Sequence, residues 1–140
     1  MDYLTFGSHH ATAVTFNNFG ILILGQSGAG KSHLAMQLIG RNAQLISDDV
    51  VTINENLDLS KPDGGPALIE IRNIGLFNAP TQQRATLKLI VHLDIEESNR
   101  LPIKRTTRIG EHHVVLIAGK GIPNLDIAVA HFAKYGRAEP

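Results

Sequence analysis

The chain has 140 residues, of which 43% are hydrophobic and 19% charged, and its 13 basic and 13 acidic side chains cancel. This length suits one domain, and the balanced charge gives no broad positive field for nucleic acid or an anionic membrane. The sequence has no cysteine, which excludes disulfides and thiolate metal sites, and no apolar stretch reaches the length of a membrane span. We therefore predict a single soluble, cytoplasmic domain over residues 1–140, with neither nucleic-acid nor membrane partners.

The first strands that the sequence predicts form a hairpin. Residues 12–17 place Val14 and Phe16 on one face, with the two-residue period of a half-buried strand. A turn at 17–20 then leads into the apolar run 21–24, which predicts a buried strand. Because a turn this short joins antiparallel neighbours, we expect a mixed sheet and not a purely parallel one.

A phosphate-binding motif follows this hairpin directly. Residues 25–32, Gly-Gln-Ser-Gly-Ala-Gly-Lys-Ser, match the spacing G-x-x-x-x-G-K-[ST]. In such a loop Lys31 reaches the β- and γ-phosphates, and the Ser32 hydroxyl binds Mg²⁺. The backbone amides at the helix N-terminus surround the phosphate oxygens, here from Gly25, Gln26, Ser27, Gly28, Ala29 and Gly30. The alternative is a glycine-rich turn that merely starts a helix.

Short strands dominate the rest of the chain, so the predicted fold class is α/β with a mixed, β-rich sheet and few helices. Helical spacing of apolar residues predicts a helix from Lys31 to Arg41, with either Gly40 or Asn42 as its stop. β-like runs follow at residues 44–47, 50–53, 69–71, 87–93 and 114–117. Loops are expected at 60–66 and 96–110. Asn124 is expected to cap a second helix whose buried face carries Leu125, Ala128, Val129, Phe132 and Tyr135.

Three acidic residues are candidates for work on the phosphates. Asp48 and Asp49 separate two apolar runs, where one carboxylate could orient Mg²⁺ or its waters while the other accepts a proton from an attacking hydroxyl. The alternative is a solvated polar turn. Glu70, between Ile69 and Ile71, faces either solvent or the same cleft, where it would supply a hard oxygen ligand for Mg²⁺.

Two histidine pairs carry groups that titrate near neutral pH. His9 and His10 are predicted to follow the first strand and precede the hairpin, so one of them could contact a phosphate oxygen or pair with a carboxylate. A surface or supporting position is the alternative. His112 and His113 have no third ligand at a recognisable spacing, and we interpret them as structural.

In combination, these features resemble HPr kinase/phosphorylase, a family that phosphorylates a serine of the small phosphocarrier protein HPr. The likeness rests on a histidine before the phosphate loop, on Leu-Ile-Ser-Asp-Asp-Val-Val at 45–51, and on Glu-Ile-Arg-Asn-Ile-Gly at 70–75. It covers about residues 9–101. The resemblance implies a fold similar to phosphoenolpyruvate carboxykinase, the cofactors ATP and Mg²⁺, an HPr-like protein partner and a homo-oligomer, which is a hexamer in the family.

The resemblance also implies a role for each matching residue. His10 would lie near the transferred phosphate, Asp49 would take the proton of the target serine, and Asp48 would support it. Arg100, in Asn99-Arg100-Leu101, falls where the family has a catalytic arginine. The implied catalytic set is His10, Lys31, Asp48, Asp49 and Arg100, and the implied metal ligands are Ser32 and Glu70.

The sequence also departs from the family pattern. Asn73 replaces a glycine, and no segment like P-V-K-x-G-R follows Leu101, so serine kinase activity is favoured over phosphorolysis of the phosphoserine. Two other functions remain open at this point. One is a small-molecule kinase that uses the same loop, and the other is a regulatory module that senses ATP or phosphate without turnover.

Overall fold

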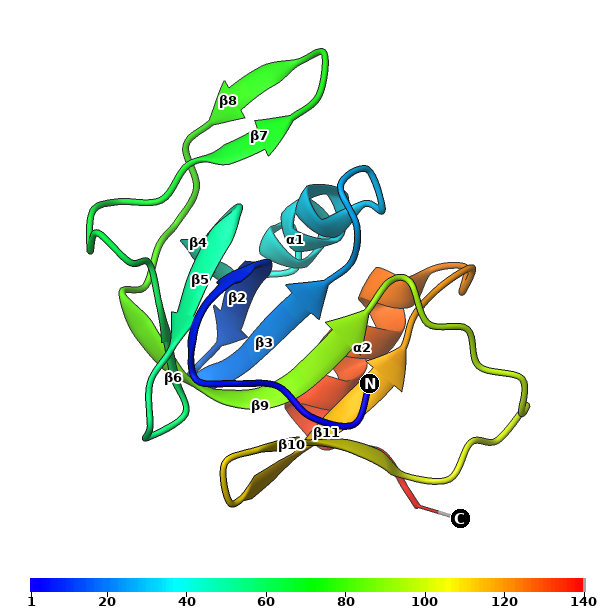
Figure 1. The fold of residues 1–140 in the computed structure, drawn as a ribbon. Coiled ribbons are helices and arrows are strands. Elements are labelled where there is room, and N and C mark those ends of the chain that lie inside the picture. Colours follow the sequence, from blue (N-terminus) through cyan, green and yellow to red (C-terminus); the bar gives the residue numbers. More distant parts are fainter. Residues whose placement is uncertain (140) are drawn as a thin grey trace.

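The computed structural model describes residues 1–139, which form a nine-stranded sheet, a separate two-stranded hairpin and two helices (Figure 1). The helices are α1 (Lys31–Ile39) and α2 (Leu125–Tyr135). The strands are β1 (Gly7–His10), β2 (Thr12–Phe16), β3 (Phe19–Leu24), β4 (Gln44–Ser47), β5 (Val50–Ile53), β6 (Asp58–Ser60), β7 (Ile69–Ile71), β8 (Gly75–Phe77), β9 (Arg84–His92), β10 (Arg105–Ile109) and β11 (His112–Ala118).

The large sheet is mixed, as predicted. Its main path runs β1-β5-β6-β9-β3-β2-β4, and β11 pairs with β9 and with β10. The predicted hairpin is present, because β2 and β3 pair antiparallel. On its other side β3 pairs parallel with β9, so both strands end at the same edge of the sheet. This edge is where α1 begins.

The sheet has a hydrophobic core on each face, and β3 contributes to both. Ile21 and Ile23 belong to the core that also contains side chains of α1 and α2, whereas Leu22 and Leu24 belong to the core on the opposite face. The alternation of strand side chains explains this division. A strand buried on both faces is rigidly held, which fixes the starting point of the phosphate loop that follows it.

One helix end agrees with the prediction and another differs from it. α1 ends at Ile39 with Gly40 at the C-cap, which is one of the two stops that the sequence offered. Asn124 occupies the N-cap of α2, but its φ of 55° is left-handed and its side chain makes no capping hydrogen bond. A capping side chain normally comes from a residue in the β region, which explains why this asparagine does not cap.

The buried face of α2 is also displaced from the predicted one. Val129 and Ala130 are buried, and Leu125, Phe132 and Ala133 are partly buried. Ala128 and Tyr135 are exposed, so their assignment to the buried face was wrong. The helix packs against α1 and one face of the sheet, and that contact selects the stripe through Ala130 and Ala133.

Four strands of the structure differ from the sequence prediction. Residues 96–110 were expected to be a loop, but they contain β10, in which Thr107 and Ile109 are buried while Thr106 and Arg108 face outward. Its polar outer face masked the alternation. β6 and β8 were not predicted, and His9 and His10 lie within β1 and not after a strand. Among residues 1–139, neither helix combines the length and hydropathy needed to cross a membrane.

Candidate active site

A cavity of about 570 Å³ lies where β3 passes into α1. It brings together most of the residues that the sequence singled out. Its lining includes His10, Thr12, Ser27, Gly28, Gly30, Lys31, Ser32, His33, Asp48, Asp49, Glu70 and Arg72. Two larger hollows, of about 790 and 770 Å³, are lined by other segments and contain none of the predicted site residues.

The phosphate loop has the backbone that the motif requires. Gly28 and Gly30 have φ angles of 86° and 102°, a region that residues with a Cβ rarely adopt. A Cβ at either position would meet no heavy atom within 4 Å, so the space beside both glycines is open. The first turn of α1 has no acidic residue, and its N-cap makes no side-chain hydrogen bond. The amides at this helix N-terminus are therefore available to an anion.

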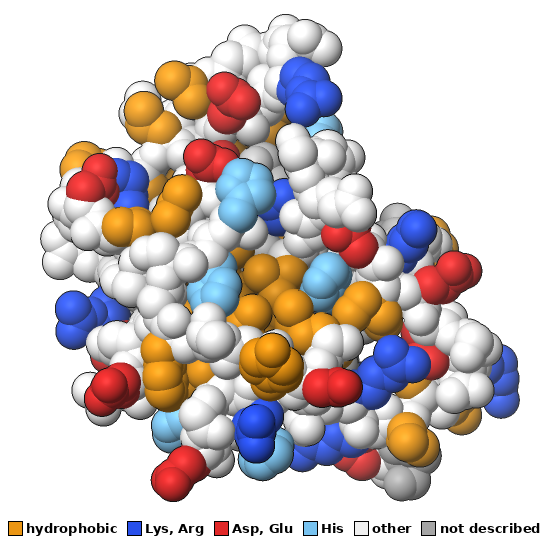
Figure 2. Space-filling model, viewed as in Figure 1, with side chains coloured by type: hydrophobic (Ala, Val, Ile, Leu, Met, Phe, Trp, Pro, Cys, Tyr) orange, Lys and Arg blue, Asp and Glu red, His pale blue; other side chains and the backbone are white. Residues whose placement is uncertain are grey.

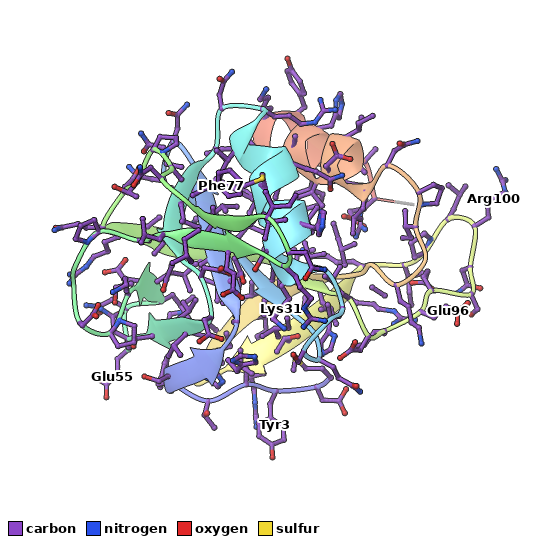
Figure 3. All side chains as sticks on the ribbon, turned by 90° about the horizontal axis from the view of Figure 1, so that it is seen from above. Tyr3, Lys31, Glu55, Phe77, Glu96 and Arg100 are labelled. Atoms are coloured by element: carbon purple, nitrogen blue, oxygen red, sulfur yellow. The ribbon has the colours of Figure 1, made fainter. Side chains whose placement is uncertain are left out.

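Lys31 is held inside this loop. Its side chain is buried, and the ammonium donates hydrogen bonds to the carbonyl oxygens of Gly25 at 2.7 Å and Gln26 at 3.0 Å. Figure 3 shows Lys31 near the centre of the molecule, in the region below the β7–β8 hairpin. The ammonium group thus lies at the loop. If a phosphate binds there, its oxygens can replace the two carbonyl oxygens as hydrogen-bond acceptors of Lys31.

Asp48 connects three elements around the cavity. Its Oδ1 accepts hydrogen bonds from the Thr12 hydroxyl on β2 and the Ser32 hydroxyl on α1, both at 2.8 Å. Its Oδ2 accepts one from the backbone amide of Glu70 on β7 at 3.1 Å. One carboxylate therefore orients the hydroxyl that the motif assigns to Mg²⁺ and ties the hairpin to the phosphate loop.

Asp49 and His10 form a pair at the mouth of the cavity. β1 pairs antiparallel with β5 and sets His10 opposite Val50, so His10 Nδ1 lies 3.1 Å from Asp49 Oδ1. The two side chains are 58% and 74% exposed. Asp49 also has a φ of 83°, which is uncommon outside glycine and tends to occur at functional sites. A large substrate can reach this carboxylate from outside.

Glu70 lines the same cavity, which is one of the two positions that its strand pattern allowed. Among residues 1–139 no three His, Cys, Asp or Glu side chains form a ready metal cluster. Mg²⁺ commonly takes only one or two carboxylates and completes its shell with water and substrate phosphates. The oxygens of Ser32, Asp48 and Glu70 around one cavity fit an ion that arrives with a polyphosphate.

Arg100 is not brought to this site. It lies between β9 and β10, its side chain is exposed, and it is not among the residues that line the cavity. In Figure 3 it projects from the edge of the molecule, far from Lys31. Its neighbours Ser98, Asn99 and Leu101 are exposed too, so no packed element holds it in place.

The sequence interpretation missed Asp94, which supports the phosphate loop. Its Oδ2 accepts a hydrogen bond from the backbone amide of Gln26 at 2.7 Å, and its own amide donates to His92 Nδ1 at 3.2 Å. Burial lowers the pKa of His92 below its usual value, while the Asp94 charge opposes that shift. The signal was available, because Asp94 follows the apolar run 87–93 and residues after parallel strands meet at one sheet edge.

Comparison with known proteins gives a consistent result. A family model described as HPr Serine kinase C-terminal domain matches residues 4–135. An HPr kinase/phosphorylase from Nitrosomonas europaea is 33% identical over 119 residues, which cover 73% of this chain and 37% of that protein. One from Listeria welshimeri is 31% identical over 134 residues, which cover 87% of this chain and 42% of that protein. The chain thus spans about two-fifths of the length of these curated relatives.

A solved structure has the same fold. The Hpr(Ser) kinase/phosphatase from Coxiella burnetii superposes with a TM-score of 0.77 at 26% identity, over 91% of this chain and 88% of that chain. The prediction of an α/β fold with a mixed, β-rich sheet and few helices is therefore confirmed. Because the family model covers nearly the whole sequence, this chain belongs to the HPr serine kinase C-terminal domain family.

Proposed function

We propose that this domain transfers the γ-phosphoryl group of ATP to a serine hydroxyl of an HPr-like phosphocarrier protein. The observation that carries the proposal is the convergence of Lys31, Asp48 and Asp49 on one cavity at the phosphate loop. A polyphosphate site next to an accessible carboxylate suits phosphoryl transfer to a hydroxyl. The names of the curated relatives support an HPr-like protein as the acceptor.

In this proposal the phosphate loop binds ATP. The amides at the start of α1 would donate to β- and γ-phosphate oxygens, and Lys31 would give up its bonds to the Gly25 and Gln26 carbonyls in favour of those oxygens. Both interactions strengthen as negative charge develops on the transferred group. The loop therefore binds ATP and also lowers the barrier to transfer.

Asp49 would act as the proton acceptor. The serine oxygen forms a bond to the γ-phosphorus, the bond between that phosphorus and the bridging oxygen breaks, and ADP leaves with the bonding electrons. The serine proton passes to Asp49, whose other contact is His10 at 3.1 Å. A neutral or protonated imidazole can hydrogen-bond this carboxylate, which holds it in place for the incoming hydroxyl.

The metal ligands would be Ser32, Asp48 and Glu70. Bound Mg²⁺ neutralises charge on the phosphates in enzymes of this type. Asp48 already accepts a hydrogen bond from the Ser32 hydroxyl, so the two oxygens are held together before nucleotide binds. Arg100 is left out of the reacting set that this arrangement supports.

The test is incubation of the purified protein with γ-labelled ATP, Mg²⁺ and an HPr protein, followed by mass spectrometry of the acceptor. Label on one serine is the expected result. Lys31→Ala serves as the control for a contaminating kinase, since it removes the loop cation and should transfer at least about 10²-fold more slowly. Equal labelling by both proteins would contradict the proposal.

Two further readouts separate the other functions. Nucleotide binding without turnover would identify a sensing module, and label on a small molecule in place of HPr would identify a different kinase. Adding inorganic phosphate to the phosphorylated acceptor tests whether the protein also removes the group by phosphorolysis, which would release pyrophosphate.

A further inference from the structure

The β7–β8 hairpin stands apart from the large sheet and carries exposed apolar side chains. Figure 1 shows it at the top of the molecule, above α1, and Figure 2 shows a few hydrophobic side chains exposed in the same part of the surface. One side of the hairpin is anchored, because β7 packs on α1 with Ile69 and Ile71 buried. Ile74 and Leu76 are 72% and 66% exposed.

The other side of the hairpin faces the candidate active site. In the antiparallel register Leu76 lies directly opposite Glu70, so both side chains lie on the same face. Leu68, two residues before Glu70, falls on that face by strand alternation and is 45% exposed. Leu68, Glu70 and Leu76 all line the cavity that contains Lys31 and Asp49. We call Leu68, Ile74 and Leu76 the hairpin patch.

The side chains of the hairpin patch offer a polyphosphate neither hydrogen-bond donors nor positive charge. Phosphate oxygens need donors and cations, and these come from the loop, whereas exposed leucine and isoleucine side chains gain free energy only when another apolar surface covers them. A folded acceptor is also too large to enter a cavity of about 570 Å³. Its serine must reach the exposed Asp49 from outside, so the acceptor surface around that serine must lie on the rim of the cavity.

We propose that the hairpin patch is the docking surface for the phospho-acceptor protein, and that it receives an apolar area adjacent to the acceptor serine. The inference rests on the proposed function and extends it from the reacting groups to partner recognition. The patch is continuous with the cavity through Leu68 and Leu76, so a protein seated on it presents its serine to Asp49. The patch contacts the acceptor to the same extent before and during phosphoryl transfer, so these contacts affect the KM for the acceptor and not kcat.

The test compares Leu76→Asn with Ile103→Asn. Asparagine removes apolar surface without adding charge beside Glu70, and Ile103 is a matched control because it is 73% exposed and lines a different hollow. Leu76→Asn should raise the KM for the HPr acceptor about tenfold with kcat and the Kd for ATP unchanged, as expected for loss of uniform binding. Ile103→Asn should match the wild type in all three quantities.

Several outcomes would overturn the proposal. One is an unchanged acceptor KM in Leu76→Asn and in the double variant Ile74→Ser/Leu76→Asn. Another is a change of the same size in Ile103→Asn. A third is self-association of the wild-type protein, measured by light scattering, that Leu76→Asn abolishes while acceptor KM stays constant, which would assign the patch to a second copy of this chain.

Failure of the proposed function gives a different result from failure of the docking surface. If the wild type transfers no phosphate, docking can still be measured by calorimetry, as the Kd of the HPr protein for the complex of this protein with an ATP analogue. Binding that Leu76→Asn weakens about tenfold would uphold the surface and refute the kinase activity. Absence of any binding by the wild type would refute the surface.

Discussion

The phosphate loop and residues 98–101, which lie between β9 and β10, both carry residues expected to act in catalysis, but the structure holds them very differently. The loop begins at β3, which is buried on both faces, and it is linked to its surroundings by Lys31, Asp48 and Asp94. Residues 98–101, which include Arg100, are all exposed and do not line the cavity. The loop is thus positioned by the fold alone.

This difference teaches which residues a single domain can preorganise. Hydrogen bonds from elements that are themselves packed fix a side chain before substrate binds, which is how electrostatic catalysis avoids reorganisation. An exposed residue between strands is placed only by whatever it later contacts. Substitutions of residues that hold the loop should therefore change the Kd for ATP, whereas substitution of Arg100 should not.

Asp49→Asn should show the largest effect. Asparagine also tolerates a positive φ, so the turn at 83° is retained while the proton acceptor is lost. We expect kcat for acceptor phosphorylation to fall by about 10²- to 10⁴-fold, the usual contribution of a general base. Calorimetry should give an ATP affinity close to that of the wild type. A kcat within threefold of the wild type would remove Asp49 from the proposed role.

Asp94→Ala should weaken nucleotide binding with a smaller effect. The substitution removes the acceptor that holds the Gln26 amide at 2.7 Å, and a hydrogen bond to a charged group contributes about 1.5–3 kcal/mol. We expect the Kd for ATP to rise about tenfold, measured by calorimetry. Asp94→Asn, which keeps an oxygen acceptor, should recover part of the loss, and Glu96→Ala on the neighbouring surface should bind ATP normally. Equal affinities for Asp94→Ala and Glu96→Ala would contradict this role.

His92 should make a modest, pH-dependent contribution to stability. Burial lowers its folded-state pKa below the unfolded value of about 6.5, so the unfolded chain binds the proton more readily. The stabilisation is present above that pH and is lost as the pH falls through the lower folded-state pKa. Urea unfolding at pH 7.5 and 5.5 should show a smaller decrease in the free energy of unfolding for His92→Gln than for the wild type. Parallel decreases in both proteins would rule the histidine out.

Arg100→Ala should have the smallest effect on nucleotide binding. Because its side chain lies outside the cavity, we expect the Kd for ATP to stay within twofold of the wild type. The same variant also sharpens the comparison between the two regions through its transfer rate. A kcat reduced by about 10³-fold would indicate that the Arg100 side chain moves from its exposed position to the transferred phosphate when the acceptor is bound.

Local sequence determined the loop and the helix of the candidate phosphate site. The strand, the glycine-rich turn, Lys31 and the helix are contiguous, so their hydrophobic periods and glycine positions are readable without knowledge of any distant contact. The β2–β3 hairpin followed from a short turn in the same way. β10 and the left-handed conformation at the N-cap of α2 were not predicted, because packing against the rest of the fold determines both and the local sequence pattern does not.

Only the tertiary structure decided how the remaining groups are arranged around that loop. Pairing of β1 with β5 sets His10 beside Asp49, and parallel pairing of β9 with β3 carries Asp94 to the loop. Docking of β7 on α1 turns Glu70 and Leu76 toward the cavity, while Arg100 is left outside. These pairings join segments far apart in the chain, and the free energy that selects them comes from burying both faces of one sheet, which no local pattern expresses.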